Sequence, residues 1–258
     1  MRIAVITGAS SGLGREYVRE VVRTEPNIDE IWVIARRKSR LEELQKHFRI
    51  PIRALVCDLT NPESLSGIEE LYRKNRPEIA LLINNAGFGK IGNYETVGRE
   101  FSDKMIDLNC RAAVDMTYIS IPYMVRGSRI MEVCSTAAFQ PFQYLGVYAA
   151  SKAFLYRFSR ALRIELLDRG IKVTAVCPYW IKDTEFIPTA QKTADDGKAI
   201  KHFPLASTAR SVAKHSLIAS RIGLPVSTPG IMCTAHRIVA KFIPSEIMMG
   251  IWALLRRV

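Results

Sequence analysis

Thr7-Gly8-Ala9-Ser10-Ser11-Gly12-Leu13-Gly14 gives the strongest indication of the fold. This octapeptide follows the apolar run at residues 3–6 and leads into a segment of helical periodicity at residues 14–24. A glycine-rich turn between a strand and a helix directs backbone N–H groups and the helix dipole at a pyrophosphate. Glycines also serve tight turns for conformational reasons alone. The position between strand and helix favours a dinucleotide site.

Short apolar runs alternate with longer helical segments over the rest of the chain, the pattern of repeated βαβ units. Strands are expected at residues 3–6, 31–34, 54–57, 80–83, 129–134 and 172–177, and more weakly at 231–234. Helices are expected at residues 14–24, 41–48, 62–75, 101–125, 147–169 and 207–222. The pattern predicts an α/β fold, a doubly wound parallel sheet of about seven strands with helices on both faces, in a single domain of residues 1–258.

Composition excludes several classes of protein. The chain has 258 residues, 48% of them apolar, which excludes disorder. Its longest apolar run, residues 247–255, is far shorter than the roughly 20 residues of a membrane-spanning helix. The net charge of +12 fits general solubility, a nucleic acid, an anionic membrane surface or an anionic ligand.

Cysteines and histidines show no chemical pattern. The five cysteines are scattered singly and odd in number, which argues against a disulfide framework, and the four histidines lack metal-ligand spacing. We therefore expect no metal site. The start of the chain lacks the apolar core of a secretory signal, and a cytoplasmic location is expected.

Two further motifs indicate specific chemistry. The expected second strand ends in Ala35-Arg36-Arg37-Lys38, where an NAD enzyme would place a carboxylate for the ribose 2′-hydroxyl. Arg36 and Arg37 suit a 2′-phosphate instead, although a solvated basic turn would look the same. Tyr148 and Lys152 share a helix face, so the ammonium is predicted to lower the pKa of the phenol toward the range of an acid–base catalyst.

Together these motifs resemble those of the classical short-chain dehydrogenase/reductase family, with its Rossmann-like fold, in the NADP-preferring branch. Thr7-Gly8-x-x-x-Gly12-x-Gly14 matches its cofactor turn, Asn84-Asn85-Ala86-Gly87 its fourth-strand motif, and Ser135 with Tyr148-x-x-x-Lys152 its active site. The resemblance implies that Ser135 holds a substrate oxygen, Tyr148 transfers the proton and Lys152 binds the nicotinamide ribose. Asn109 matches the fourth catalytic member, which supports a water chain.

The resemblance also implies an NADP(H) site and a homo-oligomer formed through the two long helices. The residues it assigns to the cofactor are Gly8, Ser10, Ser11, Gly12, Leu13, Gly14, Arg36, Arg37, Asp58, Asn85, Ala86, Gly87, Tyr148, Lys152, Pro178 and Thr184. One segment departs from the family pattern, because Tyr179 and Trp180 follow Pro178 where a glycine is usual. This leaves open whether Asp183 or Thr184 meets the nicotinamide amide, and whether Tyr179 narrows the substrate pocket or packs on the sheet.

Two segments are expected to add to the basic fold. Residues 186–222 indicate a loop-helix element that covers the substrate. Residues 236–258 are basic and apolar, with a helix break expected at Pro244. This amphipathic tail suits a peripheral contact with an anionic membrane, closure of the substrate pocket, or a subunit contact.

The expected function is an NADP(H)-dependent oxidoreductase that interconverts a ketone and a secondary alcohol on a hydrophobic, steroid- or lipid-like substrate. Two alternatives are a non-catalytic NADP-binding sensor or scaffold and a 3-oxoacyl-thioester reductase. The presence of both Tyr148 and Lys152 disfavours the sensor or scaffold, and the tail mildly disfavours the 3-oxoacyl-thioester reductase. A nucleic-acid partner would rest on charge alone, and no specific one is expected.

Overall fold

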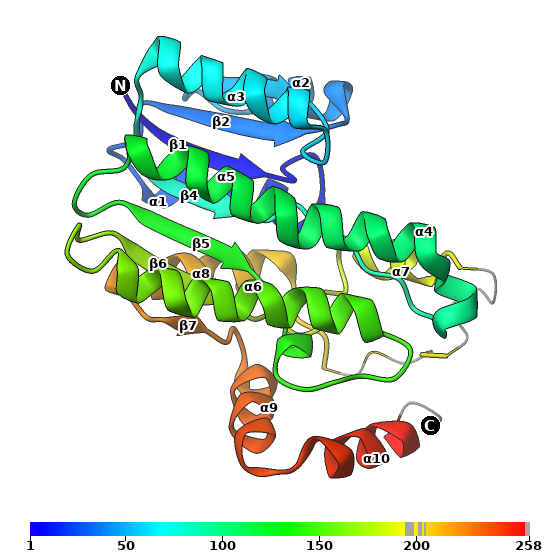
Figure 1. The fold of residues 1–258 in the computed structure, drawn as a ribbon. Helices are drawn as coiled ribbons and strands as arrows, with labels where there is room; N and C mark the ends of the chain where they lie inside the picture. Colours follow the sequence, from blue (N-terminus) through cyan, green and yellow to red (C-terminus); the bar gives the residue numbers. More distant parts are fainter. Residues whose placement is uncertain (194–198, 201–202, 204, 256–258) are drawn as a thin grey trace.

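The computed structural model describes residues 1–193, 199–200, 203 and 205–255. A seven-stranded parallel sheet crosses the molecule in the order β3-β2-β1-β4-β5-β6-β7 (Figure 1). The strands are β1 Arg2–Thr7, β2 Glu30–Ala35, β3 Ile52–Val56, β4 Glu78–Asn84, β5 Arg129–Val133, β6 Lys172–Val176 and β7 Val226–Ser227. The chain order reverses between β1 and β4, which confirms the doubly wound sheet.

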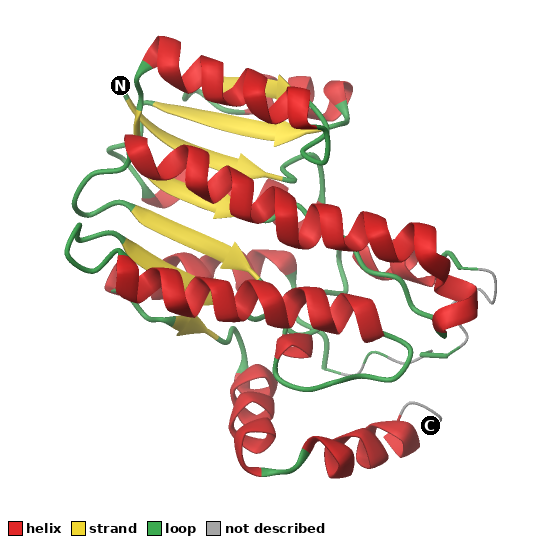
Figure 2. Cartoon of the chain, in the orientation of Figure 1, coloured by secondary structure: helices red, strands yellow, loops and turns green. Residues whose placement is uncertain are grey.

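Helices cover both faces of the sheet (Figure 2). They are α1 Gly12–Thr24, α2 Lys38–His47, α3 Pro62–Asn75, α4 Tyr94–Ile106, α5 Ala112–Ser120, α6 Gly146–Glu165, α7 Phe186–Gln191, α8 Ala209–Ile222, α9 Ile231–Phe242 and α10 Ser245–Leu255. Helices α1, α2 and α8 pack on one face, and α3, α5 and α6 on the other.

The alternation of side chains along β1 explains why its sequence is apolar throughout. Ala4 and Ile6 pack into the core under α1, α2 and α8, whereas Ile3 and Val5 pack under α3, α5 and α6. All four side chains are fully buried. Helices on both faces of a sheet bury the side chains on both sides of a strand, so the sequence of the strand is a continuous apolar run.

The expected strand at residues 231–234 is wrong. These residues begin helix α9, and the edge of β6 is paired earlier, by the short strand Val226–Ser227. The backbone N–H of Cys177 donates to the carbonyl of Ser227 at 2.8 Å, so that edge is already occupied when the chain reaches residue 231. The prediction failed because a short apolar run fits a strand and a buried turn of helix equally well.

The segment expected at residues 101–125 begins earlier and is less regular than predicted. It runs from Tyr94 and holds one π-helical turn, Asp107–Arg111, between α4 and α5, before a 3-10 turn at Ile121–Tyr123. On α5 and α6, Tyr118 and Phe154 are exposed at 57% and 49%. This aromatic surface lies on the helices from which a homo-oligomer contact is expected.

The expected element at 186–222 divides into two parts, and residues 194–198, 201–202 and 204 lie outside the described chain. Helix α7 approaches the cavity described below, whereas α8 packs beside α1, where Ser216 and the buried Tyr17 hydroxyl are 2.8 Å apart. After β7 the chain leaves the sheet as α9, breaks at Pro244 as predicted, and returns as α10 (Figure 1). Among the described residues, no helix is long and apolar enough to span a membrane.

Candidate active site

A cavity of about 670 Å³ opens at the carboxyl ends of β1, β2, β4, β5 and β6. In a doubly wound sheet, ligands bind in the crevice where the strand order reverses. The walls come from the glycine-rich turn, the basic turn after β2, the start of α6, the segment after β6, and helices α9 and α10. One cavity therefore joins most of the residues predicted for the cofactor to three of the four predicted for catalysis.

The glycine-rich turn needs its glycines for both conformation and space. Gly8 and Gly12 have φ values of +67° and +50°, in the left-handed region. Gly14 lies behind the turn rather than in the cavity wall, because a Cβ added there would lie 2.2 Å from the carbonyl oxygen of Gly8. The Asn85 side chain donates to the carbonyl of Thr7 at 3.1 Å and to that of Gly8 at 3.4 Å, and so ties the turn to β4.

Arginines from the turn after β2 reach across to the glycine-rich turn. Arg37 donates to the Ser10 hydroxyl at 3.1 Å and to the Ser11 hydroxyl at 2.5 Å. Arg36 is mostly exposed and lies 3.6 Å from the carboxylate of Asp58. All five residues, which the sequence assigns to the cofactor, line the cavity.

Glu185 is a member of this cluster that sequence reasoning missed. Its carboxylate accepts hydrogen bonds from Arg37 at 2.7 Å and from Arg40 at 2.5 Å, and these two bonds lower its pKa to about 2. The bridge fastens the segment after β6 to the turn after β2. Because 145 residues separate Arg40 from Glu185, no local pattern in the sequence could have paired them.

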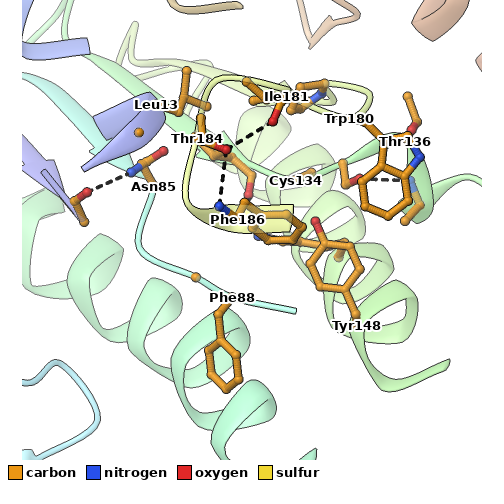
Figure 3. A pocket seen from close by; sticks show the side chains of 18 of the residues that line it. Leu13, Asn85, Phe88, Cys134, Thr136, Tyr148, Trp180, Ile181, Thr184 and Phe186 are labelled. Atoms are coloured by element: carbon orange, nitrogen blue, oxygen red, sulfur yellow. Dashed lines mark hydrogen bonds between the residues drawn. The ribbon is translucent and has the colours of Figure 1, made fainter. Parts of the chain in front are cut away.

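Ser135, Tyr148 and Lys152 line one wall of the cavity. The Tyr148 and Lys152 side chains lie one helical turn apart at the start of α6 and are only 6% and 5% exposed. The Lys152 Nζ lies 5.9 Å from the centre of the Tyr148 ring and donates to the carbonyl of Val133 at 2.8 Å. Tyr148 packs on Phe186, with ring centres 5.5 Å apart (Figure 3).

The predicted pKa shift of Tyr148 has the wrong sign. Burial raises the pKa of this phenol, and the hydrogen bond with Ser135 only partly opposes that rise. Burial likewise lowers the pKa of Lys152. The four-residue spacing of Tyr148 and Lys152 indicates a cation near the phenol. It does not show that both side chains are buried, and burial disfavours the charged form of each. In the protein alone, Tyr148 is a protonated phenol at neutral pH.

Asn109 lies behind the cavity wall, in the π-helical turn. Its side chain accepts from the backbone N–H of Phe88 at 3.0 Å and donates to the Phe88 carbonyl at 2.9 Å. It also donates to the Ser151 hydroxyl at 3.0 Å. A Cβ added to Gly87 would lie 2.9 Å from the Asn109 oxygen and 3.3 Å from Lys152 Nζ, so only this glycine separates the two side chains. Single π-turns inside helices are frequent at functional sites.

The segment after β6 resolves part of the ambiguity in the sequence. Thr184 lines the cavity and packs on Gly12, whereas Asp183 accepts from the backbone N–H of Ala209 at 2.8 Å, at the start of α8. Pro178 and Tyr179 also line the cavity.

The half of the cavity away from the basic turn is apolar, and helices α9 and α10 supply much of it. Its apolar side chains are Phe142, Leu145, Phe186, Met232, Val239, Met248, Ile251 and Trp252. Trp252 packs edge-on against Phe142 at 5.1 Å and donates to the carbonyl of Gln143 at 3.4 Å. Of the three roles suggested for the tail, closure of the pocket agrees with this position of α9 and α10 in the cavity wall.

The described residues contain no cluster of His, Cys, Asp or Glu that could hold a metal ion. All five cysteines are free thiols, in agreement with their scattered positions.

Comparisons with known proteins place the chain in a family. Residues 2–195 match the family model described as short chain dehydrogenase. Hydroxysteroid dehydrogenase-like protein 1 of Gallus gallus is 32% identical over 238 residues, covering 89% of this chain and 68% of its own. The 17-beta-hydroxysteroid dehydrogenase type 3 of Mus musculus is 30% identical over 231 residues, covering 84% and 73%.

Solved structures agree with this placement. A short-chain dehydrogenase from Sphingobium yanoikuyae in complex with NADPH is 27% identical, has a TM-score of 0.78 and covers 95% of this chain and 96% of its own. A serine dehydrogenase complexed with NADP+ is also 27% identical, with a TM-score of 0.78 and coverage of 88% and 93%. The chain belongs to the short-chain dehydrogenase family of oxidoreductases.

Proposed function

We propose that this protein is an NADP(H)-dependent oxidoreductase that interconverts a ketone and a secondary alcohol on a hydrophobic substrate. The observation that supports this most is that Ser135, Tyr148 and Lys152 line the cavity between its cofactor side and its apolar side. On one side lie the glycine-rich and basic turns, and on the other lie the apolar side chains of α9 and α10. Relatives named as hydroxysteroid dehydrogenases agree with an apolar substrate.

The residues of the cofactor side fit NADP(H). Gly8 and Gly12 provide two positions of the turn without Cβ atoms, and a helix begins at its end, as pyrophosphate binding requires. Arg36 and Arg37 provide guanidinium groups for the 2′-phosphate. The similar structures that contain NADPH or NADP+ support the same choice. Of the sixteen residues assigned to the cofactor from the sequence, Gly14 alone lies behind the cavity wall, where it supports the turn.

The mechanism follows from the burial and hydrogen bonds of the catalytic residues. The Ser135 hydroxyl orients the substrate oxygen, and Tyr148, protonated at neutral pH, gives that oxygen its proton during reduction. NADPH, when bound, supplies the hydride. As the family resemblance implies, Lys152, beside Gly87, would hold the ribose hydroxyls, and Asn109, on the far side of that glycine, would support the water chain that returns a proton to Tyr148. Thr184 would meet the nicotinamide amide.

Two relatives identify the functions that compete with this one. Very-long-chain 3-oxoacyl-CoA reductase of Anas platyrhynchos is 31% identical over 193 residues, which favours an acyl thioester as the second candidate substrate. A Rattus norvegicus relative, 29% identical, is named as an inactive hydroxysteroid dehydrogenase-like protein 1, which represents the non-catalytic alternative. The complete set of Ser135, Tyr148 and Lys152 in this cavity supports catalysis.

A substrate screen tests the proposal. The full chain is incubated with NADPH and a panel of steroid ketones, long-chain ketones and 3-oxoacyl thioesters, and the loss of NADPH absorbance is followed. We expect turnover of at least one bulky apolar ketone and little turnover of small ketones. Turnover of thioesters alone would favour the second candidate, and NADPH binding without any turnover would favour the sensor.

Arg36→Ala is expected to weaken NADPH binding by about 10- to 100-fold, because hydrogen bonds to charged groups contribute about 1.5–3 kcal/mol. NADH lacks the 2′-phosphate, so its affinity should change by less than about threefold. Fluorescence titration of both cofactors measures the two dissociation constants. Lys38→Ala is the matched control, because it removes one positive charge two residues further on, at the start of α2, and Lys38 is not among the described residues that line the cavity. Equal losses for NADPH and NADH would contradict the role of Arg36.

Helices α9 and α10 of the tail also have an exposed apolar surface, and we propose that this surface contacts an anionic membrane. Phe242, Ile247 and Leu254 are 75%, 55% and 68% exposed, and Lys241 lies over the Phe242 ring at 5.7 Å. Exposed apolar side chains beside basic ones suit an anionic lipid interface. Because α9 and α10 also line the cavity, an apolar substrate could pass between lipid and site.

Replacement of both Phe242 and Ile247 by serine is expected to reduce binding to phosphatidylserine-containing vesicles by at least roughly tenfold, since each buried side chain contributes about 1.5–3 kcal/mol. Vesicle cosedimentation at low and high salt measures this, and binding of the parent protein should weaken as salt screens the basic groups. Phe154→Ser, on α6, is the control. Unchanged sedimentation of the double variant, or a parent protein that stays in solution, would remove the membrane role.

A further inference from the structure

We propose that Gln140 and His236 form a recognition site for an uncharged oxygen function of the substrate, a hydroxyl or carbonyl remote from the reacting carbon. This inference rests on the proposed function and narrows its substrate class. It assigns to the protein elongated apolar ketones and alcohols that have a second, neutral oxygen group.

The two side chains meet inside the cavity from distant parts of the chain. Gln140 follows the 3-10 turn Thr136–Ala138, whereas His236 lies on α9. The His236 Nε2 and the Gln140 Oε1 are 2.8 Å apart, and both residues line the cavity. Gln140 is only 8% exposed, so its amide lies in the wall and not on the outer surface.

Aromatic and aliphatic groups surround this pair. The His236 ring meets the rings of Phe139 and Phe142 edge-on, with centres 5.9 and 5.8 Å apart. Met232 and Val239, on the same helix, also line the cavity. A polar pair on an otherwise apolar wall fixes the orientation of a ligand, because a few placed hydrogen-bonding groups provide most of a pocket's specificity.

The pair retains hydrogen-bonding capacity after its members bond to each other. A glutamine amide offers two N–H donors, and a neutral imidazole offers one donor and one acceptor. In the described part of the chain, neither the Gln140 amide nitrogen nor the His236 Nδ1 has a protein partner. A hydroxyl can donate to the His236 Nδ1 or accept from the Gln140 amide, and a carbonyl oxygen can accept from the amide.

The chemistry of the pair selects a neutral ligand. Burial lowers the pKa of His236 below its usual 6.5, so the ring is uncharged at neutral pH, and Gln140 has no charge. Within the described residues, no ion pair involves either side chain. A carboxylate or phosphate would need a cation here to offset its desolvation, and the arginines that provide one lie at the cofactor end of the cavity.

Matched probes test the inference. The pairs are 5α-androstan-17-one with its 3-hydroxy derivative, and 2-dodecanone with 12-hydroxy-2-dodecanone. Binding to the full chain saturated with NADP+ is measured by calorimetry, and reduction with NADPH is measured separately. In at least one pair we expect the hydroxylated ketone to bind about tenfold more tightly, and Gln140→Leu and His236→Phe to bring that ratio close to one.

Thr234→Val is the matched control, because Thr234 is on α9, bonds to Thr228 and does not line the cavity. It should keep the tenfold ratio. A variant is used only if its thermal midpoint and its NADPH affinity equal those of the parent protein. The affinity for the unsubstituted ketone is the internal reference, because a general packing effect would change the affinity for both members of a pair. Equal binding of both members of each pair, no binding of any probe, or a ratio that both variants retain would overturn the inference. Selective binding without turnover would support it while contradicting the proposed reaction.

Discussion

Tyr148→Phe is expected to lower kcat/KM for ketone reduction by roughly 10²- to 10⁴-fold, the usual contribution of a positioned acid–base group. The phenyl ring keeps the contact with Phe186, so the substitution removes the proton donor and little else. Stopped-flow and steady-state measurements of NADPH oxidation give the rate. NADPH affinity should change much less than the rate, because the phenol acts on the substrate oxygen.

The sign of the pKa shift adds a pH dependence to this experiment. Because burial raises the pKa of Tyr148, the phenol keeps its proton at neutral pH, and reduction stays active there. Alcohol oxidation needs the phenolate, so its rate should rise with pH. Tyr156→Phe, on the same helix, removes a hydroxyl outside the cavity lining and should leave both profiles unchanged. A Tyr148→Phe protein that kept the parental rate would show that another group supplies the proton.

Gly14→Ala is expected to abolish tight cofactor binding and to lower the free energy of unfolding by about 1–3 kcal/mol, the usual cost of overpacking. The new Cβ would lie 2.2 Å from the carbonyl oxygen of Gly8 and 2.8 Å from the Asn85 side-chain nitrogen. The first contact is with backbone, which cannot rotate away, so the cofactor turn itself must move. Urea denaturation and NADPH titration measure the two effects.

Gly67→Ala provides the control for this prediction. Gly67 lies in helix α3, and a Cβ added there meets nothing within 4 Å. Alanine is favoured over glycine inside a helix by about 1 kcal/mol, so the control should be slightly more stable and bind NADPH as before. A Gly14→Ala protein with parental stability and NADPH affinity would contradict the close contact between the turn and α1.

Much of this architecture could be predicted from the chain because its elements obey local rules. Every strand from β1 to β6 overlaps a short run at which the sequence predicts a strand, and α3 begins and ends at the residues expected, 62 and 75. The cofactor turn and the Ser135, Tyr148 and Lys152 set follow from motifs with fixed spacing. The seven-stranded doubly wound sheet and the family membership are confirmed.

The errors and omissions come from interactions between distant residues. The two-residue strand β7 is too short to have a hydrophobic pattern of its own. The sequence therefore predicts the last strand at the next apolar run, residues 231–234. The π-turn around Asn109 depends on hydrogen bonds with Phe88 and Ser151, which belong to other elements. The shift of the Tyr148 pKa depends on the burial of α6, and burial is a property of the whole fold.

The bridge from Glu185 to Arg37 means that an anionic group of the cofactor has to displace a carboxylate at the cofactor side of the cavity. A phosphate that reaches Arg37 competes with a carboxylate whose pKa is about 2, so no physiological pH neutralises the competitor. Half-exposed ion pairs contribute at most about 1 kcal/mol, so the Arg37–Glu185 pair is weak enough for a phosphate to displace. Glu185 directly precedes Phe186, which packs on Tyr148. The carboxylate that holds Arg37 is therefore one residue away from the ring that packs on Tyr148.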